Sequence, residues 1–492
     1  MRIDQTAVAA DTRPVEHDRL LDAPNFIRAI RDSGYVSLAS ALAELIDNAI
    51  QAEATMIDIG IRRDDPRAFP TITVEDNGIG MNGNELMACL QFGGSSRFDS
   101  RHSIGRYGMG LPAASLSQAR RVEVTAWQAA GPVRTVSLDV DEVMSGAPVL
   151  QAHEDGVRGV SASGCRVTWI GCDRIEYRRL AWLDRALRRD LGQMFRRFLL
   201  DTTVVRINGE EVLPIDPMML MTQENGASAH LAFDPLHYEI DTGRGSTGMV
   251  TIRFAMLPVH AWHSLDKAAK RRIGVVGHGG VSILRAGREI ARGWHLMGGK
   301  RKENYDDWWR CEIEFAPELD EHFGITVNKQ GVRPSPTLRE ALEPDLESLA
   351  RLLNGRVRQA FEQVKFEAAV EGSCRIAAAA DADLPVIHTA GRAHGALAYR
   401  FAARPLAGDS MFELTLAQRH LDVTLNSDHT GFGALYRPLQ DMGDVGASLR
   451  TSLELLLLSF ARSAITVGLS DCDRRDLVQT WGATYGRMLQ HT

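Results

Sequence analysis

The sequence predicts a mixed α/β chain, built as an α+β sandwich of helices against sheets and followed by further α/β parts. Segments such as "TITVEDNG" alternate apolar and polar residues, which is typical of half-buried strands. Other segments repeat apolar residues every three or four positions, as amphipathic helices do. With 492 residues, 44% of them hydrophobic and 24% charged, the chain is long enough for two to four globular domains.

The first predicted domain covers residues 1–200 and places helices against an antiparallel-leaning sheet. Apolar spacing predicts helices over residues 24–53, interrupted at the "DSGY" that ends at Tyr35. Alternating segments predict strands at 55–63, 71–78, 120–128, 133–140 and 164–171, before an Arg-rich helix at 176–200.

Three further parts are predicted after residue 200. The second domain, 201–370, contains an Asn-Gly hairpin signal at 208–209, strands at 249–257, 279–291 and 309–316, and a long helix from residue 335. The Ala/Gly-rich segment 371–395 is predicted as a linker. Residues 396–492 form a small α/β C-terminal domain, which we interpret as an association domain.

The composition argues against several classes of protein. A net charge of −7 gives no general reason to expect nucleic-acid binding, although local basic patches remain open. The six cysteines are scattered without a CxxC pair, which argues against a structural zinc site and a disulfide framework. The first thirty residues lack a signal-peptide core, and no apolar run reaches membrane-spanning length. We therefore expect a cytoplasmic protein without a membrane contact.

The segment "ALAELIDNAI" places three polar residues inside an apolar helix. Glu44 and Asn48 are four positions apart and share a helix face. A carboxylate there can act as a general base on water, and an amide oxygen suits Mg²⁺. Asp47 is interpreted as a supporting residue. Taken alone, the motif fits a solvated helix face better than a site.

Two glycine motifs follow. In "VEDNGIGM", Asp76 ends a strand as a hydrogen-bond acceptor suited to an exocyclic amine, and Gly78 and Gly80 allow close backbone approach. A plain strand-to-loop turn is an equal alternative. In "IGRYGMGL", glycines precede a helix and form a predicted phosphate cradle. It follows a loop rather than a strand, so it is not a Rossmann fingerprint, and no P-loop motif is present.

In this order the three motifs resemble the GHKL (Bergerat-fold) ATPases, which include a heat-shock chaperone, type II topoisomerases, MutL, MORC proteins and histidine kinases. The resemblance covers about residues 24–200. It implies ATP and Mg²⁺ as cofactors, Glu44 as the catalytic base, Asn48 as the Mg²⁺ ligand and Asp76 as the reader of adenine. The other implied nucleotide contacts are Gly78, Gly80, Met81, Gly93, Ser95, Ser96, Gly105, Arg106, Tyr107, Gly108, Met109, Gly110 and Cys165.

One position departs from the family pattern. The family often carries Gly-Thr on a late strand, whereas this chain has Cys165 after Gly164. A thiol is a weaker hydrogen-bonding group than a hydroxyl, so the contact to the adenine-bound water is in doubt. Thr168 lies three residues further on and is expected to face the other side of the strand.

The second domain favours the MutL, MORC and chaperone branch over histidine kinases. These proteins carry a following ribosomal-S5-like transducer domain with a lysine that reaches the γ-phosphate. By this resemblance Lys329, in "FGITVNKQGVRP", is the second catalytic residue. An exposed loop lysine is the alternative.

The resemblance implies a slow ATPase that forms an ATP-dependent homodimer, as a DNA clamp or a remodeller of a protein partner. A role in bacterial defence or DNA processing is an analogy. A chaperone-like remodeller and a non-hydrolysing ATP-binding scaffold remain alternatives. The basic segments 267–272 and 298–302 are the candidates for contacts with DNA phosphates. The arginines between 174 and 197 are interpreted as a salt-bridged surface, and the aromatic run at 305–310 as core packing.

Overall fold

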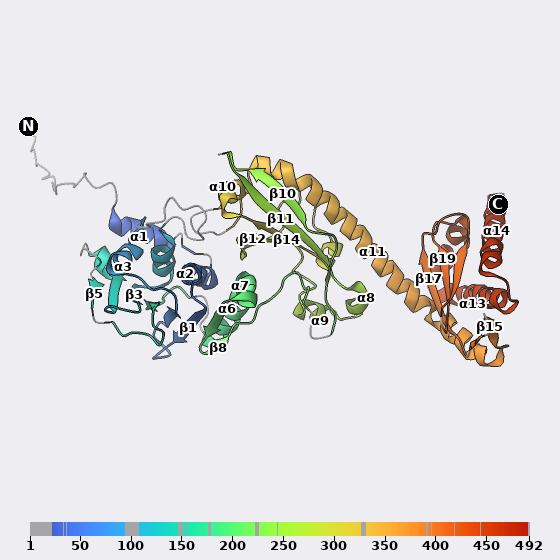
Figure 1. Cartoon of the computed structure of the whole chain (residues 1–492), viewed down its shortest axis with the longest axis horizontal. Helices are drawn as coiled ribbons and strands as arrows, with labels where there is room; N and C mark the ends of the chain where they lie inside the picture. The colour runs from blue at the N-terminus through green and yellow to red at the C-terminus, as the bar shows by residue number, and fades with distance from the viewer. Residues whose placement is uncertain are drawn as a thin grey trace, which may run out of the picture. The chain divides into compact units, whose positions relative to one another are not determined.

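The computed structural model shows two compact units, drawn in Figure 1. Met1–Pro258 and Asp266–Arg351 form the first unit, and Val259–Leu265 and Leu352–Thr492 form the second. The structure describes residues 22–32, 34–35, 37–93, 108–145, 150, 152–154, 156–175, 179–221, 226–243, 245–325, 331–389, 392–394, 396–417, 419–442 and 444–490.

The first unit begins with an eight-stranded sheet in the order β5-β4-β3-β6-β2-β1-β7-β8. Neighbouring strands are antiparallel except β1 and β7, which are parallel. The sheet confirms the antiparallel-leaning prediction and all five strands predicted before residue 200. Its strands are β1 (Met56–Arg62), β2 (Thr71–Asp76), β3 (Arg121–Trp127), β4 (Arg134–Asp139), β5 (Ala152–His153), β6 (Gly164–Ile170), β7 (Val204–Ile207) and β8 (Glu210–Glu211).

Helices cover one face of this sheet. Strand β1 buries Ile57, Ile59 and Ile61, whereas the alternate residues between them are exposed. Because alternate residues of a strand face opposite sides, one face carries the core and the other meets water. This arrangement confirms the α+β sandwich. The helices are α1 (Ala23–Asp32), α2 (Leu38–Gln51), α3 (Gly83–Cys89), α4 (Gly110–Gln118), α5 (Val140–Met144), α6 (Leu180–Met194) and α7 (Arg196–Asp201).

Helix α2 begins where the sequence predicts a break between two helices. Ser37 is its N-cap: the Ser37 Oγ accepts from the Ser40 backbone N–H at 3.2 Å, and Ser40 Oγ accepts from the Ser37 N–H at 3.1 Å. This reciprocal capping box satisfies two amide groups that the first turn of a helix leaves unpaired. The polar residues of α2 are thereby held at fixed positions in the unit.

The first sheet extends further along the chain than the predicted boundary at residue 200. Strand β7 pairs with β1, and β8 forms a hairpin with β7. Asn208 and Gly209, with φ of 51° and 84°, make the two-residue turn that the Asn-Gly dipeptide predicts. The physical reason for the later end is the parallel pairing of β7 with β1, which no local pattern specifies.

A second sheet follows in the same unit, in the order β10-β11-β14-β12-β13, with β9 beside β11. Trp308 and Trp309, the latter at the start of β14, are buried, which confirms the prediction of core packing for the aromatic run. Its strands are β9 (His230–Leu231), β10 (Leu236–Asp241), β11 (Thr247–Met256), β12 (Val281–Arg285), β13 (Arg288–Gly293) and β14 (Trp309–Phe315). The short helices here are α9 (Lys267–Arg272), η1 (Asn304–Trp308), η2 (Pro317–Leu319) and α10 (Asp320–Phe323).

Helix α11 (Pro336–Ala380) is continuous for 45 residues, with Pro344 inside it. It therefore takes up the first ten residues of the segment 371–395 that the sequence predicts as a linker. The division between the two units falls within the helix, after Arg351. The domain boundaries predicted at residues 370 and 395 stay a prediction about domain function. Alanine-rich sequence is compatible with a linker as well as with a helix.

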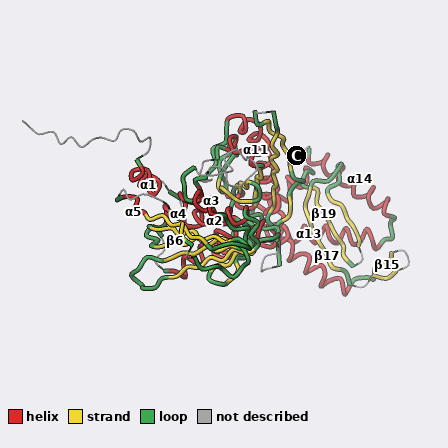
Figure 2. Tube along the Cα trace, turned by 60° about the vertical axis from the view of Figure 1, so that its left-hand side comes forward, coloured by secondary structure: helices red, strands yellow, loops and turns green. Residues whose placement is uncertain are grey.

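The second unit contains a three-stranded sheet in the order β17-β19-β18, accompanied by helices α13 and α14 (Figure 2). Within the described part of the chain, no helix combines the length and the apolar composition needed to cross a membrane. The elements are α8 (Val259–Trp262), η3 (Asp381–Asp383), β15 (Ile387–Thr389), β16 (Arg392–His394), β17 (Ala398–Arg404), β18 (Phe412–Ala417), β19 (His420–Asn426), η4 (Phe432–Tyr436), α12 (Arg437–Asp441), α13 (Asp444–Thr466) and α14 (Asp471–Leu489).

Candidate active site

Helix α2 turns two of its three polar residues into the interior. Glu44 and Asp47 are 3% and 1% exposed, whereas Asn48 is exposed. Carboxylates are rarely buried unless they are paired, because the interior solvates charge poorly. The solvated-face alternative therefore does not describe Glu44 and Asp47, and Asn48 is the one of the three that meets solvent.

Glu44 lies against the first turn of α4. A Cβ added at Gly110 would stand 2.7 Å from Oε2 of Glu44, so glycine is what allows this approach. The N-cap of α4 is Met109, and its side chain makes no capping hydrogen bond. Pro112 has no N–H, which leaves the N–H groups of Gly110 and Leu111 to face an anion at the helix start. The predicted base and the predicted phosphate cradle are thus brought together.

Arg288, at the start of β13, pairs with the buried carboxylates of α2. Its Nη1 donates to Oδ2 of Asp47 and lies 3.5 Å from Oε1 of Glu44, and the residue is only 4% exposed. Its guanidinium stands 5.6 Å from the ring centroid of Phe195. Burial by itself would lower the pKa of Arg288, but the charges of Asp47 and Glu44 outweigh it and raise that pKa. Arg288 is therefore a fixed positive charge beside the predicted base.

Tyr35 completes this buried group. Its hydroxyl is buried without a hydrogen-bond partner among the described residues. Burial raises the pKa of Tyr35, and the charge of Glu44 raises it further. A neutral hydroxyl therefore lies near the two carboxylates at all ordinary pH values.

Sequence reasoning missed both Arg288 and Tyr35. The signal for Arg288 was present, because Arg285, Arg288 and Glu289 lie in an apolar hairpin and are each buried. The partner of Arg288 was not readable, since Asp47 lies 241 residues away in the chain. Tyr35 carried no signal, because a tyrosine before a helix is an ordinary core residue.

A second group of buried ion pairs joins α7 to the second sheet, the sheet that also contains Arg288. Arg196 donates to Oε2 of Glu289 and to Oε2 of Glu312, each at 2.7 Å, and is 3% exposed. Burial raises the pKa of Glu312, but Arg196 and Arg197 outweigh it and hold that pKa below its usual range. The predicted salt-bridged surface for the Arg-rich segment is therefore wrong for Arg196, which is interior because the second sheet covers it.

Asp76 ends β2, next to the loop that the sequence predicts to read adenine. The backbone N–H of Gly78 donates to its Oδ1 at 2.9 Å, and the backbone of Cys165 also hydrogen-bonds to it. Burial raises the pKa of Asp76 to about 6, against these hydrogen bonds, which lower it. A largely buried carboxylate that has no cationic partner among the described residues suits a neutral donor such as an amine N–H.

The two glycines after Asp76 are explained by contacts within the chain. Gly80 has φ of +72°, and a Cβ there would stand 2.1 Å from the carbonyl oxygen of Trp127. A Cβ at Gly78 would stand 2.6 Å from the carbonyl oxygen of Ala52. The glycines therefore hold the loop against α2 and β3, which fixes the position of the loop that follows Asp76. Met81 follows them, half-buried against the core.

Cys165 lies on β6 directly opposite Asp76 of β2. Burial raises the pKa of its thiol well above the usual value, and the charge of Asp76 raises it further. The group is a neutral thiol, which is a weak donor beside a carboxylate. Thr168 is three positions along the strand and faces the opposite side, because side chains alternate.

The glycine-rich segment between α3 and α4 is described only at its ends. Gly93 donates its backbone N–H to the carbonyl of Gly108 at 3.2 Å, so the two ends meet. Gly108 has φ of +60°. The predicted site residues Ser95, Ser96, Gly105, Arg106, Tyr107 and, in another loop, Lys329 lie outside the described residues.

Lys300, in one of the two basic segments proposed to contact DNA phosphates, is not available for that contact. Lys300 is buried, and its Nζ donates to both carboxylate oxygens of Asp306, at 2.7 and 2.8 Å. An ammonium held in this way is not presented to a phosphate. In the other basic segment, Lys267, Arg271 and Arg272 of α9 are exposed.

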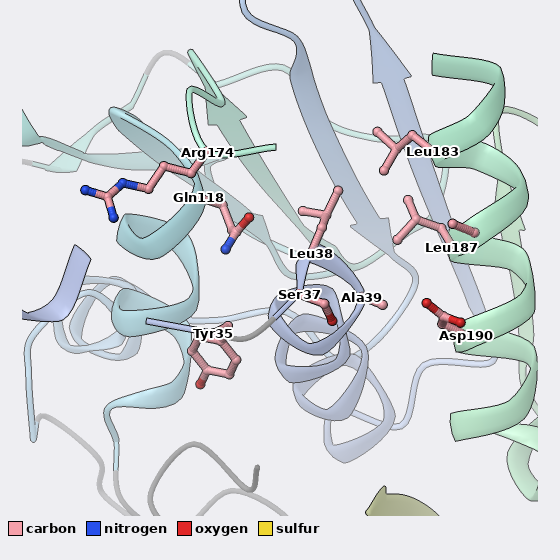
Figure 3. Close-up of a pocket in the computed structure, with 10 residues that line it drawn as sticks. Tyr35, Ser37, Leu38, Ala39, Gln118, Arg174, Leu183, Leu187 and Asp190 are labelled. Atoms are coloured by element: carbon pink, nitrogen blue, oxygen red, sulfur yellow. The ribbon is translucent and has the colours of Figure 1, made fainter. Parts of the chain in front are cut away.

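The pocket in Figure 3 is a different feature from the predicted nucleotide site. It has a volume of about 70 Å³ and is lined by residues of α2 and α6, including Leu38, Leu187 and Asp190. Ligand sites for molecules of drug size are roughly 300 Å³ or larger. None of the predicted site residues lines this pocket, and its volume suits a few waters.

The described residues fit a nucleotide better than a resident metal. They contain no group of three or more His, Cys, Asp or Glu side chains placed to hold an ion. The exposed amide of Asn48 can supply one oxygen to Mg²⁺, whose remaining ligands would be phosphate and water oxygens. The open first turn of α4 and the buried Asp76 carboxylate offer complementary contacts to the two ends of a nucleotide.

Comparison with known proteins decides the family of this region. Residues 36–156 match the family described as histidine kinase-, DNA gyrase B- and HSP90-like ATPases. The chain carries a GHKL ATPase domain. The match contains Glu44 and Asn48, Asp76, and Gly110, so all three motifs on which the resemblance rested lie within the GHKL domain.

Individual relatives place the GHKL domain among the MutL and MORC proteins. Over 81 residues it is 46% identical to ATPase MORC2B of Mus musculus, covering 16% of this chain and 8% of that protein. Over 96 residues it is 31% identical to Protein MICRORCHIDIA 4 of Arabidopsis thaliana, covering 19% of this chain and 12% of that protein. Over 125 residues it is 34% identical to DNA mismatch repair protein MutL of Rhodospirillum rubrum, covering 24% and 19%. The similarity spans less than a quarter of the chain and no more than a fifth of these relatives.

Proposed function

We propose that this chain binds ATP with Mg²⁺ and hydrolyses it slowly to ADP and phosphate, as a conformational switch. The observation that carries the proposal is the buried carboxylate of Glu44 beside the open first turn of α4, within the GHKL domain. A base next to a phosphate cradle is the arrangement that attack of water on a terminal phosphate requires.

Each residue has a separate task in this proposal. Asp76 accepts a hydrogen bond from the adenine amine, and the N–H groups of Gly110 and Leu111 donate to phosphate oxygens. Asn48 presents its amide oxygen to Mg²⁺, which neutralises phosphate charge when bound. Glu44 accepts the proton of the attacking water. Lys329 is proposed to contact the γ-phosphate from the following domain.

Arg288 supports the switch part of the proposal. It belongs to the second sheet yet pairs with Asp47 and lies beside Glu44. A carboxylate that accepts a hydrogen bond from a guanidinium has fewer lone pairs to offer to water. We infer that Glu44 acts on water after the second sheet has shifted Arg288, so that turnover and domain movement are coupled.

The wider role remains part of the same proposal. ATP-dependent association of two GHKL domains would drive a DNA clamp or the remodelling of a protein partner. The names of the MORC and MutL relatives favour the branch, and the exposed basic residues of α9 favour a DNA contact over none. A chaperone-like action on protein is the alternative within this branch.

The non-hydrolysing scaffold is a second candidate, favoured by the pairing of Glu44 with Arg288. Substitution of Glu44 separates the two functions. In Glu44→Ala we expect ATP to bind with unchanged stoichiometry while turnover falls by a hundredfold or more, because the proton acceptor is lost. Calorimetry gives the binding and phosphate release gives the turnover. Equal turnover by Glu44→Ala and the unaltered chain contradicts the base assignment, and no turnover by either supports the scaffold.

A further inference from the structure

The loop that leads into β12 is rich in glycine and in unused backbone donors (Figure 1). It covers residues 277–280, with the sequence "GHGG", and none of its four backbone N–H groups has an acceptor among the described residues. Gly277 and Gly280 have φ of +85° and +146°, which glycine adopts without strain. Gly277 and His278 are exposed, and a Cβ added at Gly277 would meet open space. The loop therefore presents N–H groups at the surface, where an anion can accept from them.

Two cations are fixed against this loop by its own carbonyl groups. Nη2 of Arg292, near the end of β13, donates to the carbonyl of His278 at 3.0 Å. Nζ of Lys302 donates to the carbonyl of Gly279 at 3.1 Å. A guanidinium has five N–H donors and an ammonium has three, so each group keeps donors for a further partner. The two side chains therefore hold positive charge beside the N–H groups of the loop.

A third cation lies buried beneath the same part of the chain. Arg310 of β14 is 2% exposed, and its Nη2 donates to the carbonyls of Gly274 and Val275. Within the described residues, its hydrogen bonds go to carbonyl oxygens and to the sulfur of Met219, and none goes to a carboxylate. Burial lowers the pKa of Arg310 to about 9, and the charge of Arg292 contributes to this shift. An anion nearby would stabilise this buried charge.

The charge around His278 is unbalanced. The side chains that face it are three arginines and one carboxylate: Arg189 of α6, Arg292, Arg310 and Asp307. Burial lowers the pKa of His278, and the three arginines lower it further against the effect of Asp307. The imidazole is therefore neutral at pH 7, and a positive potential surrounds it.

The carboxylates in this region are already engaged by other cations. Asp307 lies 3.6 Å from Nζ of Lys302. Asp190 accepts from Nε of Arg189 at 2.9 Å. Glu289, on the same strand as Arg292, pairs with the buried arginine of α7. The positive charge that these pairs leave uncompensated is that of the two arginines on β13 and β14.

We propose that residues 277–280 form a site for a phosphate dianion, either inorganic phosphate or the terminal phosphate of a small monoester. The backbone N–H groups of the loop and the guanidinium of Arg292 donate to its oxygens, and Lys302 adds a positive charge. Successive backbone N–H groups and a guanidinium are both suited to an oxyanion. The charge of a dianion matches the two uncompensated arginines. A phosphodiester carries a single charge and is expected to bind more weakly.

This site uses none of the residues assigned to ATP, so it goes beyond the proposed ATPase and is tested without nucleotide. The probe is inorganic phosphate, titrated into the full chain while the ring of His278 is followed by NMR, with His278→Gln to identify its signals. We expect phosphate to raise the pKa of His278, because a nearby anion stabilises the imidazolium. A pKa of His278 that phosphate leaves unchanged would overturn the proposal, whether or not the chain hydrolyses ATP.

Two substitutions should change phosphate affinity in opposite directions. Arg292→Ala removes a charged donor and is expected to weaken binding by roughly tenfold or more. Asp307→Asn removes the carboxylate that opposes the anion and should tighten binding, so the test stays decisive if Arg292→Ala does not fold. Arg185→Ala, at an exposed arginine of α6, is the matched control and should bind as the unaltered chain does. Weaker binding by Asp307→Asn, or a folded Arg292→Ala with unchanged affinity, contradicts the site.

A comparison of esters tests the class of ligand. Phenyl phosphate, a monoester dianion, should shift the His278 signals at concentrations similar to those of inorganic phosphate. Dimethyl phosphate, a diester with one charge, should bind at least roughly tenfold more weakly, because half of the ligand charge is lost. Equal affinity for the two esters would overturn the assignment to a dianion.

Discussion

Helices α2 and α13 depart in opposite ways from the usual distribution of charged and apolar side chains between solvent and core. Helix α2 buries charge, with Glu44 and Asp47 nearly inaccessible. Helix α13 exposes apolar side chains: Val445, Leu449 and Leu456 are 79%, 60% and 64% exposed. In an ordinary surface helix, charged residues face water and leucines face the core. The departure of α2 is explained by a contact that the helix's own sequence does not contain, the pairing with Arg288.

The two contacts differ in how they are satisfied. The carboxylates of α2 already have Arg288 as a partner from the same chain, and the pair is stable only while both sides are present. The exposed apolar side chains of α13, Val445, Leu449 and Leu456, have no cover within the described part of the chain. Buried charge thus reports a coupling inside the molecule, whereas the exposed apolar side chains of α13 meet solvent.

Removing Arg288 is the substitution from which we expect the largest effect on stability. Arg288→Ala leaves two buried carboxylates without their guanidinium, and we expect the free energy of unfolding to fall by about 3 kcal/mol or more. Denaturant unfolding measures the change. Arg185→Ala, at an exposed arginine of α6, should change stability by less than about 0.5 kcal/mol.

A second substitution shows whether charge is the cause. Asp47→Asn combined with Arg288→Ala removes one of the two uncompensated charges, so part of the lost stability should return. If the double variant is no more stable than Arg288→Ala, the loss comes from packing against Phe195 instead.

Asp76 differs from the carboxylates of α2, because it is half-buried and has no cationic partner in the part of the chain that the structure describes. Its pKa in the folded chain is about 6, above the ordinary value of 3.8, so the folded chain takes up a proton that the unfolded chain has released. Stability from this group is therefore present below pH 3.8 and is lost as pH rises through about 6. Asp76→Asn cannot ionise and should raise the free energy of unfolding at pH 7 by up to about 3 kcal/mol without nucleotide.

The same variant should lose ATP binding, because an amide in place of the carboxylate weakens the contact with the adenine amine. In the unaltered chain, ATP affinity should fall as pH drops below about 6, where Asp76 becomes protonated. Thermal unfolding and calorimetry on the same samples give both results. A variant that binds ATP normally, or is less stable than the unaltered chain at pH 7, would contradict the role given to Asp76.

The elements and motifs that depend on local spacing could be predicted from the sequence. Glu44, Asn48 and Asp76 could be named as candidates because helix periodicity and a strand ending in Asp-x-Gly are local signals; their roles stay predictions. The partners across the fold were not found, since Arg288 and Asp47 are far apart in the chain. Lys300 was misjudged for a different reason: a basic run predicts a surface, whereas the structure buries Lys300 in an ion pair with the nearby Asp306. The pairing of β7 with β1 also needed the tertiary structure.

The smallest expected effect concerns Cys165, which stands opposite Asp76. Cys165→Thr replaces a weak donor with a hydroxyl, and we expect ATP affinity to rise by about threefold, with unfolding changed by less than about 1 kcal/mol. Calorimetric titration with ATP measures it. Thr168→Ser, on the opposite face of β6, is the control and should leave affinity unchanged.

The central claim is that nucleotide at α2 acts on the second sheet through Arg288. Hydrogen–deuterium exchange of the full chain, with and without a non-hydrolysable ATP analogue and Mg²⁺, tests it most directly. The account predicts altered exchange in peptides covering Val281–Gly293 as well as in the GHKL domain, and no change in either region for Asp76→Asn. Protection confined to residues 36–156, with β12 and β13 unchanged, would contradict it.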